Sequence, residues 1–328
     1  MAYTSIDNPE LYFQTKLYTG NGGTQSITLD GSENMQPDWV WIKVRSQAHN
    51  HYLYDAVRGV QEKLSSNTNG AEIDMGSTGL TAFNSDGFSI GNDTDENASG
   101  QTYASWNWKE SATAGFDIVS YTGTGSAKTV SHNLGVKPDV IICKSRSGAE
   151  EWRPYFSVLG ATKGMRLNGT NAEDTDSGYW NNTEPTSSVF TVGTNGGTNG
   201  NGVTFIAYCF ADVKGYSKFG SYTGNGNADG TFVYTGFKPA WVMIKESSAS
   251  ADWFIFDTKR IGFNGGVYRL KANTTETENT SNVMDILSNG FKLRVADGDK
   301  NGSGDTYIYM AFAESPFVNS NSVPNNAR

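Results

Sequence analysis

The chain has 328 residues, of which 37% are apolar and 18% are charged, and it contains 38 glycines. The charged fraction is too low and the glycine content too high for a coiled coil or a long-helix protein, which the composition therefore excludes. The net charge of −9 argues against nucleic acid and anionic membranes as partners, because proteins that hold polyanions present a basic face.

Residues 1–11 contain neither a basic nor an apolar run, so no secretory signal is predicted there. We expect this segment to be an N-terminal docking arm, with a frayed end as the alternative. No segment of the chain approaches the run of about 20 apolar residues that crosses a bilayer, so we expect no membrane insertion.

Three copies of one unit follow the arm. The segment PDWVWIK at 37–43 recurs as PDVIICK at 138–144 and as PAWVMIK at 239–245, with a constant spacing of 101 residues. A motif of the form Tyr-Thr-Gly-x-Gly precedes each copy. A period of about 100 residues matches a complete small domain rather than a solenoid repeat. We predict repeat 1 at 12–111, repeat 2 at 116–215, repeat 3 at 218–317 and a C-terminal tail at 318–328.

The repeated segment is predicted to be a central strand. Trp39 and Trp41 lie on one side of it and Val40 and Ile42 on the other, so both faces are apolar. Short strands separated by Gly/Asn turns favour an all-β fold, namely three tandem antiparallel β-sandwich domains of about 100 residues each. The residues expected in the repeat core are Trp39, Trp41, Ile142, Trp241 and Ile244. We expect the lysines that end the strand to reach solvent: Lys43, Lys144 and Lys245.

Two aromatic residues of the second unit are candidates for binding. Tyr179 and Trp180 lie in a polar loop rather than in an obvious strand. Exposed aromatic rings stack on sugars and anchor protein contacts, so these two define a candidate binding surface. The alternative is that the rings fold back over their own sandwich.

The segment 297–305 of the third unit is similar to the early part of a calcium loop, with candidate ligands Asp297, Asp299, Asn301 and Asp305. The twelfth position of such a loop is a bidentate Glu, whereas this chain has Ile308. The corresponding hairpin of the second unit has no carboxylate, so a polar hairpin tip is the alternative interpretation. Apart from calcium at this loop, we expect no cofactor.

Catalytic signatures are missing from the sequence. It contains no Gly-x-Ser-x-Gly elbow, phosphate-binding loop or Cys-x-x-Cys pair, and the spacing of its three histidines indicates no triad. We expect a protein that is not an enzyme. The competing class is a carbohydrate-degrading depolymerase, which would require two carboxylates in one groove.

The combined motifs resemble a family of virion proteins from marine bacteriophages that infect cyanobacteria and pelagic bacteria. The likeness extends over nearly the whole chain, and in the first unit it is carried by residues 18–22, 37–43, 54–59, 86–88 and 103–109. The second unit departs from the pattern, with Trp152 and Phe156 where the first has His51 and Asp55.

The resemblance implies a virion structural protein that is assembled in the host cytoplasm, and it supplies no catalytic residues. We expect a tail-fibre or spike component that presents a host-contact surface, with a capsid decoration or adaptor protein as the alternative. The expected partners are other tail or capsid proteins, further copies of the chain, for instance in a trimer, and a glycan of the host surface.

Overall fold

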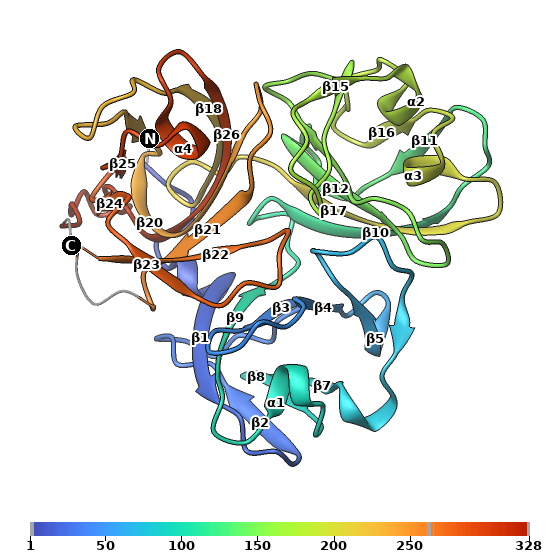
Figure 1. Ribbon diagram of the computed structural model, residues 1–328, viewed down its shortest axis with the longest axis horizontal. Coiled ribbons are helices and arrows are strands. Elements are labelled where there is room, and N and C mark those ends of the chain that lie inside the picture. Colours follow the sequence, from blue (N-terminus) through green and yellow to red (C-terminus); the bar gives the residue numbers. More distant parts are fainter. Residues whose placement is uncertain (1–2, 261–263, 265, 327–328) are drawn as a thin grey trace.

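The computed structural model describes residues 3–260, 264 and 266–326. The three repeats form three lobes that surround a common centre (Figure 1). The predicted all-β class is confirmed, because the described part of the chain consists of antiparallel sheets and helical segments of at most four residues. No described helix is long and apolar enough to span a membrane.

Lobe 1 contains two antiparallel sheets that pack face to face. Its elements are η1 (Pro9–Leu11), β1 (Phe13–Thr19), β2 (Gln25–Thr28), β3 (Trp39–Val44), β4 (Tyr52–Asp55), β5 (Gly59–Leu64), β6 (Ile73–Asp74), η2 (Gly76–Thr78), β7 (Leu80–Asn84), β8 (Gly87–Ile90), α1 (Thr94–Asn97) and β9 (Thr102–Trp108). The inner sheet has the order β1-β9-β3-β4-β5-β6, and the outer sheet has the order β2-β8-β7.

Lobe 2 repeats this plan with a shorter inner sheet. Its elements are β10 (Phe116–Thr122), β11 (Lys128–Ser131), β12 (Val140–Ser145), β13 (Arg153–Phe156), β14 (Lys163–Gly164), β15 (Asp174–Thr175), α2 (Ser177–Trp180), β16 (Val189–Val192), α3 (Gly196–Asn199) and β17 (Thr204–Phe210). The inner sheet has the order β10-β17-β12-β13, and β11 pairs with β16 in the outer one.

Lobe 3 has the same two layers and longer central strands. Its elements are β18 (Ser217–Thr223), β19 (Phe232–Tyr234), β20 (Phe237–Glu246), β21 (Trp253–Asp257), β22 (Val267–Lys271), β23 (Asn279–Ser281), β24 (Met284–Leu287), β25 (Gly290–Leu293), α4 (Gly298–Asn301) and β26 (Thr306–Pro316). The inner sheet has the order β18-β26-β20-β21-β22-β23, and the outer sheet has the order β19-β25-β24.

The central strands of the inner sheet of each lobe are buried on both faces. In β3, Val40 and Ile42 pack into the core between the two sheets of lobe 1, whereas Trp39 and Trp41 face the centre of the molecule. The five residues expected in the repeat core are all at most 2% exposed; they are Trp39, Trp41, Ile142, Trp241 and Ile244. Of these, Ile244 belongs to the core of its own lobe, and the other four to a core that all three lobes share.

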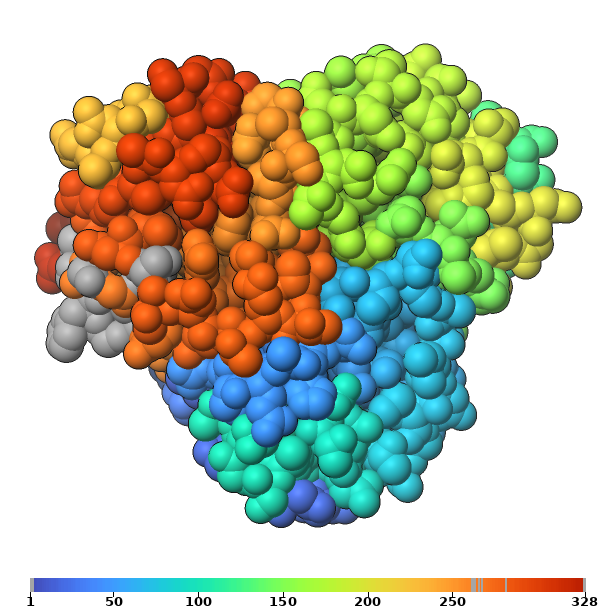
Figure 2. All heavy atoms as spheres, in the orientation of Figure 1, coloured from blue at the N-terminus to red at the C-terminus, as the bar shows by residue number. Residues whose placement is uncertain are grey.

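Aromatic rings from the three lobes meet in this shared core. Trp39 of lobe 1 stacks on Tyr208 of lobe 2 with ring centroids 4.4 Å apart. Phe312 of lobe 3 lies 5.6 Å from Trp108 of lobe 1 and 5.7 Å from Phe210 of lobe 2. Each lobe therefore completes the burial of the other two, and the coloured surfaces of the lobes abut in Figure 2.

The recurring Tyr-Thr-Gly-x-Gly motif anchors the start of each outer hairpin against the short helix of the same lobe. In lobe 1, the Tyr18 hydroxyl donates to the Glu96 carbonyl at 2.8 Å. A Cβ at Gly20 would lie 2.3 Å from the Ala98 carbonyl oxygen, and Gly22 has φ +73°, so both positions require glycine. Lobes 2 and 3 repeat the contact, because Tyr121 donates to the Thr198 carbonyl and Tyr222 to the Lys300 carbonyl.

The three strand-end lysines do not reach solvent, so that prediction is wrong. Lys43, Lys144 and Lys245 are fully buried, and their Nζ atoms donate to backbone carbonyls. Lys144 donates to Asn69 O of lobe 1 at 3.2 Å, and Lys43 to Thr275 O of lobe 3 at 3.3 Å. Burial lowers the pKa of each of the three lysines to about 8.

This burial predicts a characteristic pH dependence of stability. In the folded state each of the three lysines has a pKa of about 8, which is lower than the pKa of the same lysine in the unfolded chain. At pH values between the folded and the unfolded pKa, the unfolded state therefore binds more protons than the folded state. The free energy of unfolding should therefore rise from about pH 8 to about pH 10. Urea unfolding across this range measures the rise, and Lys144→Met should reduce its slope by about a third. A slope that Lys144→Met leaves unchanged would contradict this assignment.

Candidate binding pocket

The interfaces between lobes repeat around the molecule. The backbone N–H groups of Glu72, Glu173 and Glu278 donate to the carbonyls of Arg146, Ser247 and Arg45 in the adjoining lobe. A ring nitrogen adds a second contact at each interface, because Trp152 donates to Ser65 O and Trp253 to Arg166 O, both at 2.9 Å.

His51 makes the equivalent contact between lobes 1 and 3. Its Nε2 lies 2.9 Å from Lys271 O, and its Nδ1 accepts from Trp41 Nε1 at 2.8 Å. These partners assign the proton of the neutral ring to Nε2. Burial, together with the charge of Lys43, holds the pKa of His51 well below its usual value.

In the described part of the chain, two of the three interfaces contain a buried ionic network. Between lobes 1 and 2, Arg58 pairs with Asp55 and, at 3.1 Å, with Glu72, which also binds Arg146 at 2.8 Å. The pKa of the Glu72 carboxyl lies below its usual value. Burial by itself would raise this pKa, but the hydrogen bonds from Arg146 and the charge of Arg58 together outweigh that effect. The Tyr208 hydroxyl donates to Asp55 at 2.7 Å.

The interface between lobes 3 and 1 has the same network. Arg260 binds Asp257 at 2.5 Å and Glu278 at 3.1 Å, and Arg45 binds Glu278 at 2.8 Å. The third interface differs, because Phe156 and Leu159 stand where the other lobes have the Asp–Arg pair. Phe156 packs there against Trp253 with ring centroids 6.1 Å apart. These buried groups join the lobes and form no site that is open to a ligand.

The aromatic pair proposed from the sequence is not exposed. Tyr179 and Trp180 form the end of α2 and are only 3% and 2% exposed, so that expectation is wrong. The Asp176 side chain caps α2 by accepting from Gly178 N, which turns the loop back over its own lobe. There the Tyr179 hydroxyl donates to Asp174 at 2.9 Å, and the Trp180 ring packs edge-on against Tyr155.

Among the described residues, the three carboxylates of the candidate calcium loop do not form a metal-binding group. The described residues include no group of three or more His, Cys, Asp or Glu side chains that could hold a metal. Asp297 caps α4 and pairs with Lys300 at 2.6 Å. The Asn301 amide is fully buried and donates to the carbonyls of Asn227 and Val295, both at 2.8 Å. Asn97 and Asn199 make the same type of contact in the other lobes, so Asn301 is part of the common fold.

Asn301→Ala should lower the free energy of unfolding, because it removes a fully buried amide that donates to the partly buried carbonyl of Val295. Each buried polar group left without a partner costs about 1–3 kcal/mol, which urea unfolding can measure. Calcium and a chelator should both leave the unfolding midpoint of the wild-type chain unchanged. A calcium-dependent increase in that midpoint would instead support a metal site at this hairpin.

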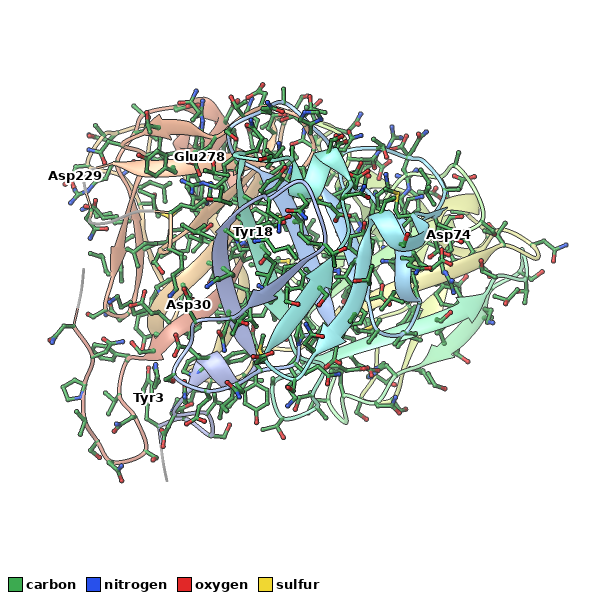
Figure 3. The ribbon with its side chains drawn as sticks, turned by 90° about the horizontal axis from the view of Figure 1, so that it is seen from below. Tyr3, Tyr18, Asp30, Asp74, Asp229 and Glu278 are labelled. Atoms are coloured by element: carbon green, nitrogen blue, oxygen red, sulfur yellow. The ribbon has the colours of Figure 1, made fainter. Side chains whose placement is uncertain are left out.

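A different surface of lobe 3 forms an open pocket of about 540 Å³. It lies where the N-terminal arm meets β19, and Figure 3 shows Tyr3 on the face of the molecule opposite to Glu278. We call it the Tyr3–Tyr234 pocket, and its described lining residues are Tyr3, Asp212, Lys214, Ser217, Lys218, Tyr234, Thr235 and Gly236.

The N-terminal arm forms one wall of this pocket. The described part of the arm packs on its own chain, with Ile6 buried in the shared core and the Thr4 hydroxyl donating to Lys214 O at 2.9 Å. The Tyr3 hydroxyl donates to Gly236 O at 3.0 Å and lies 3.0 Å from the Tyr234 hydroxyl. The interpretation of this segment as a frayed end is therefore wrong for residues 3–11.

Strand β19 forms the opposite wall and distinguishes lobe 3 from the other lobes. Val233 points into the lobe and pairs with Phe291, whereas Phe232 and Tyr234 point outward and are 43% and 54% exposed. The residues in register with these two are Ser26 and Thr28 in lobe 1 and Thr129 and Ser131 in lobe 2. Sequence analysis missed this pair, although aligning the three units at the Asp-Gly or Asn-Gly turn would have revealed the substitution.

The pocket also holds three charged groups. Lys218 pairs with Asp212, which in addition accepts from Phe219 N at 2.7 Å. Burial raises the pKa of Asp212, and the hydrogen bond from Lys218 opposes that rise. The Lys214 ammonium lies 4.5 Å from the centroid of the Tyr3 ring, and no carboxylate in the described part of the chain pairs with it. The pocket thus combines aromatic rings with an excess of one positive charge.

Comparisons with known proteins define the family of the chain but not its activity. No curated protein and no solved structure matches it. One family model, described as "Domain of unknown function (DUF7483)", matches residues 8–316 and therefore spans all three lobes. The chain belongs to the DUF7483 family.

Proposed function

We propose that the chain is a structural protein of a bacteriophage particle, a tail-fibre or spike component that contacts the host surface without catalysing a reaction. The sequence motifs described above support the virion assignment. The proposed location is the assembled particle, with assembly in the host cytoplasm and other tail or capsid proteins as partners.

The observation that carries this proposal is that the three lobes form one rigid body, and that the surface of lobe 3 differs from the surfaces of the other two. All three lobes share one aromatic core and equivalent backbone contacts, which restricts motion between them. Among the described residues, lobe 3 alone presents outward aromatic side chains on this edge strand of its outer sheet, at Phe232 and Tyr234. A recognition surface on a rigid support loses little conformational entropy when it binds. The three lobes of a single chain already surround one centre. The proposal also includes an assembly of three such chains.

The second candidate function is a capsid decoration or adaptor protein. The observation that favours it is the meeting of the arm and the tail at one end of the molecule. Tyr3 packs against Phe317 with ring centroids 6.4 Å apart, and Asp7 accepts a hydrogen bond from Ser320 N at 2.7 Å. A surface built from both terminal segments is suited to attachment to a shell or a tail.

The carboxylates that line the pockets of the described structure favour recognition over hydrolysis. The Tyr3–Tyr234 pocket has one described carboxylate, Asp212, whereas a glycosidase uses two that are about 5–10 Å apart. A smaller pocket of about 160 Å³ is lined by Glu10 and Glu314, but it is below the usual size of ligand sites. Glu10 accepts from Ser32 N at 2.7 Å, and Glu314 pairs with Lys238 at 2.9 Å.

The proposal is tested on purified particles. Mass spectrometry should detect the chain in them, and cryo-electron microscopy should show where it lies. A few to some tens of copies on the tail would support the fibre or spike role, whereas hundreds of copies on the shell would support the decoration role. Absence of the chain from purified particles of a phage that encodes it would overturn both.

A further inference from the structure

The geometry points to the Tyr3–Tyr234 pocket as a binding site for a saccharide that carries a carboxylate group. This inference rests on the proposed host-contact role and names the ligand class of that contact. It depends on three features of the pocket: a fixed aromatic wall, an ammonium group that has no carboxylate partner among the described residues, and sufficient volume.

The aromatic wall is exposed and held in place. Tyr234 is 54% exposed, yet it lies on a strand that pairs with β25, so its backbone is fixed. Tyr3 is held by its hydrogen bond to Gly236 O and by its edge-on contact with Phe317. Sugar rings have one apolar C–H face and polar edges, so a flat aromatic ring with a hydroxyl at its rim offers a partner to both.

The charges of the pocket favour an anionic ligand. Lys214 and Lys218 supply two ammonium groups against the one carboxylate of Asp212, in a chain whose net charge is −9. Lys218 is already paired with Asp212. Lys214 instead caps the Tyr3 ring, so it is the cation that a ligand carboxylate would pair with.

The volume of the pocket agrees with a small ligand. At about 540 Å³ it lies within the range of about 300–1,000 Å³ that is usual for small-molecule sites. Phe232 lies two residues before Tyr234 on the same face of β19, so it extends the aromatic surface beyond the pocket. A chain of several sugar units could therefore continue along this strand.

Binding of the purified full chain to an array of acidic saccharides tests the inference. The array should contain oligosaccharides of hexuronic acids and of sialic acids, each beside its methyl ester, which keeps the size and removes the charge. We expect the wild-type chain to bind at least one acid and to bind its ester at least about tenfold more weakly, as for a loss of about 1.4 kcal/mol.

Two variants and one control locate the binding. Tyr234→Thr introduces the residue that lobe 1 has at Thr28, so it should fold, and it should weaken binding of acid and ester by at least about tenfold. Lys214→Gln should weaken binding of the acid alone. Ile73→Thr replaces a side chain of lobe 1 that is 51% exposed, and it should leave binding unchanged. Unfolding midpoints equal to that of the wild type would show that the variants are folded.

The possible results separate this inference from the proposed function. If the chain is found in particles but binds none of the acidic saccharides, the ligand class is wrong and the virion role stands. If acid and ester bind equally, or if Tyr234→Thr has no effect, the assignment to this pocket is wrong. If the chain binds acids as expected but is absent from particles, the pocket assignment stands and the virion role fails.

Discussion

Trp241→Ala is expected to reduce the free energy of unfolding by about 3–5 kcal/mol, the usual cost of removing a large buried aromatic side chain. Trp241 is 2% exposed, and its ring centroid lies 5.8 Å from that of Phe312 in its own lobe. It also lies 5.6 Å from Trp108 and 6.4 Å from Trp106, which belong to lobe 1. The cavity would therefore open between two lobes rather than within one.

The location of Trp241 also predicts the form of the unfolding transition. Because the shared core joins all three lobes, we expect the wild-type chain and Trp241→Ala to unfold in one transition each, with equal calorimetric and van't Hoff enthalpies. Phe232→Ala is a suitable control in the same lobe, because its side chain is 43% exposed, and it should cost less than about 1 kcal/mol. Separate transitions for the lobes, or a loss below about 1 kcal/mol for Trp241→Ala, would contradict this packing.

The second large effect is expected for Arg58→Leu. This change leaves the buried Asp55 carboxylate without its cation, and breaking a buried ion pair in this way costs about 3–5 kcal/mol. Glu72 keeps Arg146 as a partner, so the loss should arise mainly at Asp55. Urea unfolding at neutral pH measures it.

The third interface supplies a matched rescue for this variant. Lobe 2 has Phe156 and Leu159 at the positions of Asp55 and Arg58, so Asp55→Phe combined with Arg58→Leu copies a pairing that the fold already accommodates. We expect the double variant to regain about half or more of the lost stability, because it removes the unpaired charge. Lys137→Gln, which breaks an exposed pair with Glu184, should cost at most about 1 kcal/mol. A double variant no more stable than Arg58→Leu would show that the network does more than neutralise charge.

The strands of each lobe follow from local sequence patterns. In β3, alternation of aromatic and aliphatic residues, with Pro37 before the strand, predicts a central strand that is apolar on both faces. The Asp-Gly and Asn-Gly pairs predict the turns into β8 and β25. Strand alternation and turn pairs each involve only a few neighbouring residues. The sequence of a single repeat is therefore sufficient to predict these strands and turns.

The candidate sites depended on contacts that local patterns do not contain. Tyr179 and Trp180 lie in a polar loop, but a cap at Asp176 turns that loop onto the lobe. Lys43 ends a strand in a way that is typical of a solvent-facing lysine, yet its ammonium group meets carbonyls from another lobe. In both cases the partner is distant in the sequence or depends on a backbone turn, so burial could not be read from the neighbouring residues.

By itself, the sequence of this protein determined a threefold repeat, strands that are apolar on both faces and the all-β class, because these depend on side-chain alternation and turn residues within short segments. Only the tertiary structure decided that Trp39 faces a core shared by three lobes while Val40 faces the core of its own lobe. It also decided that the arm and β19 together form the Tyr3–Tyr234 pocket. The physical reason is that both features require segments separated by up to 231 residues to meet, as Tyr3 and Tyr234 do, and side-chain alternation does not specify such long-range contacts.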